Sequence, residues 1–331
     1  MKYIINDSVD PWFNLALEEY FLRQKTREDL VCLWQNDNSV IIGRHQNTAN
    51  EVNQEVADQE HVKIARRTTG GGAVYHDLGN LNYTFITNFN LEAPQNVNFK
   101  VFAQPVIDAL ASYGLQAELS GRNDILLDGK KISGTAQACI GNRFMFHGTL
   151  LYDLNSDMAQ KVLSVSKEKI ESKGVKSVKS RIGNIKPYLP EGTGILELKE
   201  KIASAFAKNE GFERYTLSEK DLYEIQKLRK EKYATKEWIF GESRIAGIRN
   251  KARYPGGELE CMIELDHGSI KNIKFYGDFL GIYDTDEIEK ILQNTLYEVS
   301  EVRQKIEQKK LNLFFGDITT DNVLECMFMT D

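Results

Sequence analysis

The order of hydrophobic and polar residues along the first 240 positions predicts strands and helices in irregular succession. Short apolar runs of strand length occur at 3–5, 31–34, 40–42, 62–65, 81–87 and 144–152. Helical spacing of apolar residues occurs at 99–110, 195–206 and 222–228. A further helix is expected to run to Leu22, with Asp10 as its N-cap and Pro11 at its first position. Because strands and helices do not alternate strictly, we expect an α+β fold with a mixed or antiparallel sheet, not a doubly wound fold.

A second, smaller unit is expected toward the C-terminus, with a boundary near residues 241–249. Alternating apolar residues flank the turn sequence Asp-His-Gly-Ser at 266–269, which predicts a hairpin. One apolar stripe with helical spacing then runs from Ile288 to Ile306 and predicts a single long amphipathic helix. The expected organisation is a large domain over residues 1–243 and a small α+β domain over residues 249–331.

Composition and charge narrow the class of protein. Of the 331 residues, 41% are hydrophobic and 27% are charged, which is typical of a soluble protein with a large core. No apolar stretch approaches the ~20 residues of a membrane helix, and the first residues lack the apolar region of a signal peptide, so we expect a cytoplasmic protein without membrane contact. The net charge of −6 argues against broad nucleic-acid binding. Four scattered cysteines predict free thiols and no structural zinc.

The segment RRTTGGGAVYHD, which begins at Arg66, places two arginines before three consecutive glycines. Without side chains at the glycines, a ligand can approach the backbone closely, and the N–H groups can face an anion. Arginines beside such a bend suit phosphate or carboxylate. No Gly-Lys-Ser/Thr and no G-x-G-x-x-G is present, so the two commonest nucleotide loops are excluded. A flexible turn is the alternative interpretation of the glycines taken alone.

The segment GRNDILLDGKKISGTAQ supplies a second group of candidate residues. Its Asp-Gly pair at 128–129 lies between alternating apolar residues and predicts a hairpin. The two strands would bring Asn123 and Asp124 close to Lys131, where a carboxylate can fix the ammonium group or hold Mg²⁺. Small residues after Lys131 would leave room for a ligand to approach it.

Together these segments resemble those of lipoate–protein ligases, within the superfamily that also contains biotin ligases and octanoyltransferases. The matching stretches are RRTTGGGAVYHDLGNLNYTF at 66–85, GRNDILLDGKKISGTAQ at 121–137 and FHGTLL at 146–151, with weaker matches IIGRHQN at 41–47 and KSVKSRIGN at 176–184. They follow the order and spacing of the family over most of the first 240 residues. The GRGRRG-type loop of biotin ligases is missing, which argues against that branch.

The resemblance implies a catalytic core akin to those of class II aminoacyl-tRNA synthetases and biotin ligases, followed by the accessory domain of stand-alone ligases. It also implies a reaction in two steps. The carboxylate of free lipoate attacks ATP to give lipoyl-AMP and pyrophosphate, and a lysine of an acceptor protein then displaces AMP. ATP and Mg²⁺ are the implied cofactors. The implied acceptors are the lipoyl domains of 2-oxoacid dehydrogenase acyltransferase subunits and the H protein of glycine cleavage.

The resemblance also implies a role for particular residues of this chain. Lys131 would bridge the lipoyl carbonyl and the adenylate phosphate, Asn123 would orient it, and Asp124 would orient it or hold Mg²⁺. Arg67 would contact the nucleotide or its phosphates. The remaining residues of the implied binding site are Gly70, Gly71, Gly72, Ala73, Val74, Tyr75, His76 and His147, with the two histidines lining the acyl site or ordering the loops.

Other interpretations stay open at this stage. One is an octanoyl or lipoyl transferase that needs no ATP and uses Cys139 as its nucleophile, and another is a non-catalytic lipoate binder. His45 is expected to be exposed or to cap a helix. The basic residues Lys173, Lys176, Lys179, Arg181 and Lys186 are interpreted as a solvated face or a docking surface for an acidic partner. The preferred acyl chain, lipoate or octanoate, is left open.

Overall fold

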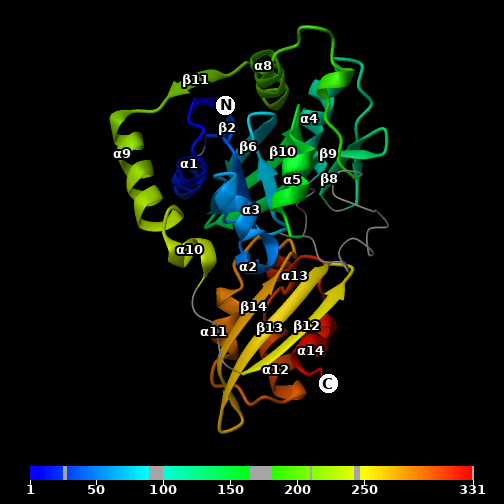
Figure 1. Ribbon diagram of the computed structural model, residues 1–331. Coiled ribbons are helices and arrows are strands. Elements are labelled where there is room, and N and C mark those ends of the chain that lie inside the picture. The colour runs from blue at the N-terminus through cyan, green and yellow to red at the C-terminus, as the bar shows by residue number, and fades with distance from the viewer. Residues whose placement is uncertain are drawn as a thin grey trace.

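The computed structural model describes residues 1–24, 28–88, 100–121, 123–164, 181–208, 211–241 and 247–329. Figure 1 shows a larger part, built from the chain up to α10, above a smaller part that contains β12, β13 and β14. The predicted α+β class is confirmed, because helices pack on sheets in both parts.

The larger part is built around an eight-stranded sheet in the order β11-β1-β2-β6-β10-β9-β8-β7. β1 runs parallel to both of its neighbours, whereas the pairs from β2 to β7 are antiparallel, so the sheet is mixed as expected. A smaller sheet has the order β4-β3-β5. The strands are β1 (Lys2–Ile5), β2 (Leu30–Trp34), β3 (Ser39–Ile42), β4 (Lys63–Arg66), β5 (Val74–His76), β6 (Asn80–Asn88), β7 (Glu118–Ser120), β8 (Asp124–Leu127), β9 (Lys130–Ile140), β10 (Arg143–Leu151) and β11 (Glu213–Thr216).

The helices of the larger part cover these sheets. They are α1 (Pro11–Arg23), α2 (Thr48–Glu51), α3 (Gln54–Gln59), α4 (Lys100–Ala111), α5 (Ser156–Val162), α8 (Ile195–Phe206), α9 (Glu219–Leu228) and α10 (Lys236–Phe240), with a π-helical turn at Arg229–Tyr233 and a 3-10 turn at Lys186–Tyr188. Along the part of the chain that the structure describes, no helix has the length and apolar character needed to cross a bilayer.

β2 shows how the large sheet is buried on both faces. All five of its residues are buried. Val31 and Leu33 pack with residues of α4 and α8, whereas Cys32 and Trp34 pack with residues of α1 on the other side. Successive side chains of a strand point to opposite faces, so this continuous apolar run is what a strand covered on both faces requires.

α1 is covered by protein on nearly every side. It begins as predicted, because the Asp10 carboxylate accepts a hydrogen bond from the Trp12 N–H at 3.1 Å and Pro11 opens the first turn. The sheet lies on one side of α1, and α9 and the π-helical turn lie on the other. As a result, two adjacent carboxylates, Glu18 and Glu19, are buried inside the protein.

The smaller part has its own sheet and its own core. The sheet contains β12 (Ile248–Tyr254), β13 (Gly257–Asp266) and β14 (Ser269–Gly277), all antiparallel, and it packs on α11 (Asp286–Leu292), α12 (Val299–Ile306), α13 (Asn312–Phe315) and α14 (Thr320–Met327). The hairpin expected at 266–269 is confirmed, with φ values of 48° at His267 and 80° at Gly268.

The single long helix expected from Ile288 to Ile306 is wrong, because the structure has two helices, α11 and α12, in that region. The backbone between them pairs with the β13–β14 hairpin instead. Asn294 donates to the carbonyl of Ile270 at 2.8 Å, Ile270 donates to the carbonyl of Thr295 at 2.8 Å, and Asn294 has a φ of 61°. Both helices bury their apolar residues in the same core, which is why the sequence shows one uninterrupted stripe.

The two parts meet along the segment that follows β14. The N–H of Gly277 donates to the carbonyl of His45 at 2.9 Å, and the N–H of Cys139 donates to the carbonyl of Ile282 at 2.9 Å. The His45 ring stacks on the Phe279 ring with 4.9 Å between centroids. His45 is therefore buried between the two parts, and the expectation that it is exposed or caps a helix is wrong.

Candidate active site

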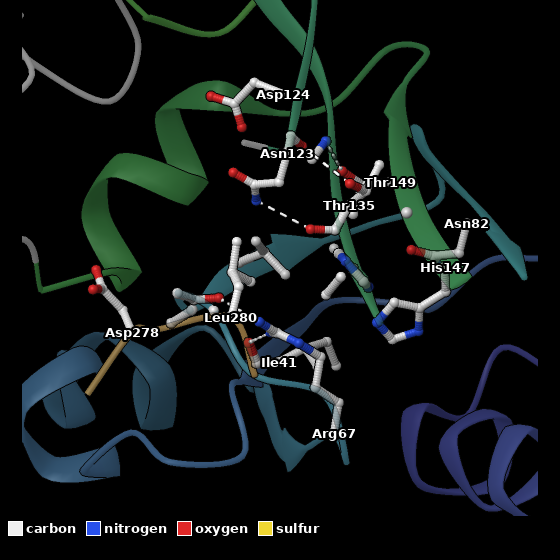
Figure 2. A pocket seen from close by; sticks show the side chains of 18 of the residues that line it. Ile41, Arg67, Asn82, Asn123, Asp124, Thr135, His147, Thr149, Asp278 and Leu280 are labelled. Carbon is white, nitrogen blue, oxygen red and sulfur yellow. Dashed lines mark hydrogen bonds between the residues drawn. The ribbon is translucent and has the colours of Figure 1, made fainter. Parts of the chain in front are cut away.

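A cavity of about 180 Å³ lies where three parts of the protein meet (Figure 2). These are the β8–β9 hairpin, the three glycines at 70–72, called the glycine segment below, and the smaller part of the protein. The residues from the predicted site that line it are Arg67, Gly71, Gly72, Ala73, Val74, His76, Asn123, Asp124, Lys131 and His147. The other lining residues are Leu15, Trp34, Ile41, Asn82, Gly134, Thr135, Ala136, Gly148, Thr149, Arg181, Arg253, Asp278 and Leu280. The structure thus brings most of the predicted site residues into one cavity.

The β8–β9 hairpin holds Lys131 beside Asp124. Its turn has φ values of 50° at Asp128 and 73° at Gly129, the left-handed conformations that an Asp-Gly turn provides. The Lys131 Nζ lies 2.6 Å from Oδ1 of Asp124. Gly134 leaves the space for this ammonium group, since a Cβ there would come within 2.7 Å of Nζ. The small residue after the lysine therefore accommodates the lysine's own side chain.

The charge on Lys131 is balanced by its surroundings. Burial lowers the pKa of Lys131, and the Asp124 carboxylate acts in the opposite direction. The second oxygen of Asp124 accepts a hydrogen bond from Arg181. Two cations thus share one carboxylate at the wall of the cavity. Asn123 is held nearby, because its side-chain amide donates to the Thr135 carbonyl at 3.0 Å (Figure 2).

Hydrogen bonds from Arg67 fix the backbone of the glycine segment. Its guanidinium donates to the carbonyls of Gly70 at 2.7 Å and Gly72 at 2.9 Å, and to the carbonyl of Ile41 at 3.2 Å. Burial lowers the pKa of Arg67 to about 10. Arg67 thus fixes the path of the glycines while its side chain forms part of the cavity wall.

A chain of buried hydrogen bonds connects Arg67 to α1. The Nε–H of Arg67 donates to Oγ1 of Thr69 at 2.9 Å, and Thr69 Oγ1 lies 2.8 Å from Nε2 of His147. The Nδ1 of His147 lies 2.9 Å from Oε1 of Glu18, and that oxygen also accepts from the hydroxyl of Thr84. A carboxylate only accepts, so the Nδ1–H of His147 donates to Glu18. Glu18 therefore orients this whole series of hydrogen bonds.

The neighbouring carboxylate, Glu19, reaches the same segment by another route. Glu19 accepts a hydrogen bond from the Tyr233 hydroxyl at 2.5 Å and is paired with Lys232 at 2.6 Å. The Tyr233 hydroxyl also hydrogen-bonds to Thr68. Each of the two threonines before the glycines is thus connected to one of the two buried glutamates of α1.

Arg66, by contrast, does not line the cavity. Its guanidinium donates to the carbonyls of Gly43 at 2.8 Å, Gln46 at 2.7 Å and Ile239 at 2.8 Å, among others. Burial lowers the pKa of Arg66 to about 10. The expectation that both arginines contact an anion therefore fails for Arg66, which ties the 43–48 turn to α10.

Two of the glycines leave room for protein rather than ligand. A Cβ on Gly70 would come within 2.4 Å of the Phe279 carbonyl oxygen, and the N–H of Gly71 donates to that oxygen at 3.1 Å. A Cβ on Gly43 would lie 1.9 Å from the carbonyl oxygen of Gly71. The close approach that the glycines were expected to allow is made here at Gly70 and Gly71 by the smaller part of the protein.

His76 and Tyr75 point to opposite sides of β5. His76 lines the cavity, its Nδ1 lies 3.1 Å from the Asn36 amide nitrogen, and burial lowers its pKa to about 3, so its ring is neutral. Tyr75 points away, packs under the smaller sheet and donates to Asn38 at 3.0 Å. Tyr75 and Gly70 are the predicted site residues that do not line the cavity.

Cys139, the nucleophile of the alternative interpretation, is buried in the core and does not line the cavity. Desolvation raises its pKa to about 12, so the thiol is protonated near neutral pH. A buried thiol that stays protonated does not suit the role of a nucleophile.

Several lining residues were missed or misread in the sequence. Arg181 belongs to the basic run interpreted as a solvated face or a docking surface, yet it bonds to Asp124 in the cavity. Lys186 of the same run is exposed and pairs with Asp153. The other members of that run, Lys173, Lys176 and Lys179, lie outside the described residues. Arg253, Asp278 and Leu280 come from the smaller part of the protein, and the local sequence around them carries no signal of this placement.

Comparison with known proteins finds relatives along nearly the whole length of the chain. The model of the lipoyl protein ligase A/B catalytic domain matches residues 10–207, and that of the bacterial lipoate protein ligase C-terminus matches residues 246–327. The chain is 40% identical to the lipoate-protein ligase LplJ of Bacillus subtilis, over 99% of this chain and 100% of that protein. It is 37% identical to lipoate–protein ligase 1 of Staphylococcus aureus, over 99% and 100% of the two chains.

Solved structures agree with this assignment. The crystal structure of LipL1 from P. falciparum in complex with lipoate is 25% identical and superposes with a TM-score of 0.80, over 98% of this chain and 97% of the other. A lipoate-protein ligase A bound with ATP is 27% identical with a TM-score of 0.62, over 72% and 98%. The fold and the order of its two parts are those of lipoate–protein ligases. The chain belongs to the lipoate–protein ligase family.

Proposed function

We propose that this cavity holds lipoyl-AMP, between an acyl end near His147 and a charged end near Asp124. The protein is an ATP-dependent lipoate–protein ligase, as its family membership establishes. The observation that supports the placement of the intermediate is the partly buried ammonium group of Lys131, held 2.6 Å from Asp124 in the cavity wall. A fixed cation in a partly dry site stabilises negative charge far better than a mobile one in water.

Lys131 acts in this scheme as an electrostatic catalyst. In the first half-reaction a lipoate carboxylate oxygen bonds to the α-phosphorus of ATP, and pyrophosphate leaves with the electron pair. Lys131 lies between the acyl and phosphate groups and offsets their mutual repulsion. In the second half-reaction the neutral amine of an acceptor lysine attacks the lipoyl carbonyl, and negative charge develops on that oxygen. AMP then leaves with the electron pair of the broken carbon–oxygen bond, and the nitrogen loses a proton to water. Asp124 keeps the ammonium group in position throughout.

Arg67 and the glycine segment form the nucleotide side of the site in this proposal. Gly72, Ala73 and Val74 line the cavity, and Arg67 beneath them adds positive charge. Tyr75 would act only through its backbone, since its side chain points away. His147 and His76 form the acyl side, where the neutral ring of His76 suits an apolar chain.

The residues of the cavity fit a magnesium ion. Mg²⁺ prefers one or two carboxylates together with substrate phosphates and water. Asp124 is the proposed ligand, and Asp278 is a second carboxylate that lines the same cavity. When bound, the ion would neutralise phosphate charge, while Lys131 and Arg181 hold the Asp124 carboxylate in place.

The acceptors proposed for the protein are lipoyl domains of 2-oxoacid dehydrogenase acyltransferase subunits and the glycine cleavage H protein. A bi-partite ligase and its E2 lipoyl domain from Thermoplasma acidophilum support the first class, since that ligase is 29% identical to this chain with a TM-score of 0.65, over 75% of this chain and 98% of that chain. We assign residues 1–243 to catalysis and residues 249–331 to an accessory domain, and we place the protein in the cytoplasm.

Two coupled measurements test the proposal. Lipoate should stimulate exchange of labelled pyrophosphate into ATP, and the purified protein should then lipoylate an isolated lipoyl domain with release of AMP. The absence of exchange, together with transfer that needs no nucleotide, would contradict the adenylate mechanism. A comparison of octanoate with lipoate in the same assay gives the acyl preference.

A further inference from the structure

The accessory domain supplies one wall of the cavity. Arg253 of β12, together with Asp278 and Leu280 after β14, lines the same space as Lys131. In Figure 2, Asp278 lies on the opposite side of the cavity from His147 and Asn82. An acyl chain that ends near His147 therefore directs the phosphates of the nucleotide toward the wall that the accessory domain forms.

Arg253 is held loosely on this wall. Its Nη1 lies 3.7 Å from a carboxylate oxygen of Glu258, and its Nη2 lies 3.6 Å from a carboxylate oxygen of Asp278. Within the described ranges, Nη1 is buried and has no hydrogen-bond partner. An unmatched buried donor is costly, and a phosphate oxygen is well suited to satisfy it.

The other cations of the cavity are more fully engaged. Lys131 and Arg181 share the Asp124 carboxylate, and Arg67 donates to the backbone of the glycine segment. The positive side chains of the cavity wall, Arg67, Lys131, Arg181 and Arg253, outnumber the carboxylates, Asp124 and Asp278. A triphosphate carries enough negative charge to balance them. Arg253 is the cation with an unsatisfied donor on the side where the phosphates would end.

We propose that Arg253 binds the pyrophosphate part of ATP during the adenylation step. The inference rests on the proposed adenylate mechanism. In that step the bond between the α-phosphorus and the bridging oxygen of the β-phosphate breaks, and negative charge accumulates on the departing pyrophosphate. Arg253 neutralises this charge. The transfer step involves no pyrophosphate and does not need Arg253.

The test separates the two half-reactions of the full-length enzyme. Arg253→Gln should raise the KM for ATP and the inhibition constant of inorganic pyrophosphate by roughly tenfold or more. Transfer from synthetic lipoyl-AMP to a lipoyl domain should stay within about twofold of the unmodified enzyme. Lys251→Gln is the matched control, because Lys251 lies on the same strand and pairs with the same Glu258 at 3.0 Å, but it does not line the cavity.

An unchanged KM for ATP, or an equal loss in both half-reactions, would overturn the inference. A wild-type enzyme without lipoate-stimulated exchange would instead disprove the adenylate mechanism itself. A second measurement needs no variant. Phenylglyoxal should modify Arg253 in the unmodified enzyme, and inorganic pyrophosphate, but not AMP, should protect it when peptides are quantified by mass spectrometry. A lack of protection by pyrophosphate would also overturn the inference.

Discussion

Glu18 holds His147 through a hydrogen bond of 2.9 Å between its carboxylate and Nδ1 of the imidazole ring. Through Thr69, this pair also sets the position of Arg67 and hence of the glycine segment. Glu18 does not line the cavity, so its influence on the reaction is indirect. It is a positioning residue rather than a catalytic one.

Two separate substitutions of Glu18, each by a residue of similar size, should distinguish its role as a hydrogen-bond acceptor from its role in packing. Glu18→Gln keeps an oxygen that accepts from His147 and Thr84, so activity should fall less than about threefold. Glu18→Leu leaves buried donors unpaired and should lower kcat/KM by roughly tenfold or more. The measurement is steady-state lipoylation with a thermal melt of each variant. Equal activity of the two variants would show that the chain of hydrogen bonds does not position the site.

Replacement of Lys131 tests the catalytic assignment directly. Lys131→Ala should lower the rate of lipoyl-AMP formation by roughly 10²–10³, the usual effect of losing one preorganised electrostatic group. Lys130→Ala is the matched control, because Lys130 is the exposed neighbour on the same strand and does not line the cavity. Pyrophosphate release and lipoyl transfer at wild-type rates in Lys131→Ala would mean that the assigned role is wrong.

Two buried histidines predict that stability decreases in mild acid. Burial lowers the pKa of both His45 and His76 to about 3, whereas an unfolded chain binds these protons near pH 6.5. The stability is therefore fully present above about pH 6.5 and is lost as the pH falls toward 3, by roughly 1.4 kcal/mol per pH unit for each histidine. Urea unfolding at about pH 7, 6 and 5 measures the slope.

The control for this experiment uses an exposed histidine of the same chain. His76→Asn should remove about half of the slope between pH 6 and 5. His267→Asn should leave the slope unchanged, since the His267 side chain is 96% exposed. A slope that responds equally to both substitutions would contradict the assignment.

Cys139→Ser distinguishes the ligase from a transferase with a cysteine nucleophile. The thiol is buried with a raised pKa and its residue does not line the cavity, so the variant should keep at least about half of the ATP-dependent activity. A loss of more than about a hundredfold, with an unchanged melting temperature, would favour the transferase. Unmodified enzyme treated with a thiol reagent should likewise stay active.

The sequence predicted the parts of the site whose structure is decided locally. The Asp-Gly turn specifies its own backbone conformation, and the register it sets is enough to bring Asp124 and Lys131 together. Alternation and apolar runs likewise identified β1, β2, β3, β4, β6 and β10 and the hairpin of β13 and β14. These features depend on residues within a few positions of one another.

Features that depend on distant packing could not be predicted in the same way. Arg253 reaches the cavity only because the accessory domain docks against the glycine segment. Arg181 looked like one of several solvated cations until the fold brought it to Asp124. Glu18 did leave a signal, since α1 is apolar on nearly every side and a glutamate in such a helix must be buried and paired.

The three glycines were expected only to let a ligand approach the backbone. Gly70 leaves room for the Phe279 carbonyl and Gly71 for the Leu280 side chain, a packing requirement that resembles a ligand requirement in sequence. The prediction of a single long helix was wrong for a related reason. Asn294 and its neighbours pair with a hairpin 24 or more residues earlier in the chain, and helical periodicity does not report such pairing.

Arg66 and Arg67 bury two guanidinium groups that, among the described residues, donate hydrogen bonds to carbonyls and hydroxyls. Dipoles solvate such ions but leave their net charge uncancelled in a medium of low polarity. Arg67 therefore adds positive charge to the wall of the cavity, whereas Arg66 keeps its charge away from that wall. In the proposed mechanism the phosphates of ATP face the charge of Arg67, so the substrate would complement the electrostatics of the cavity as well as enter the reaction.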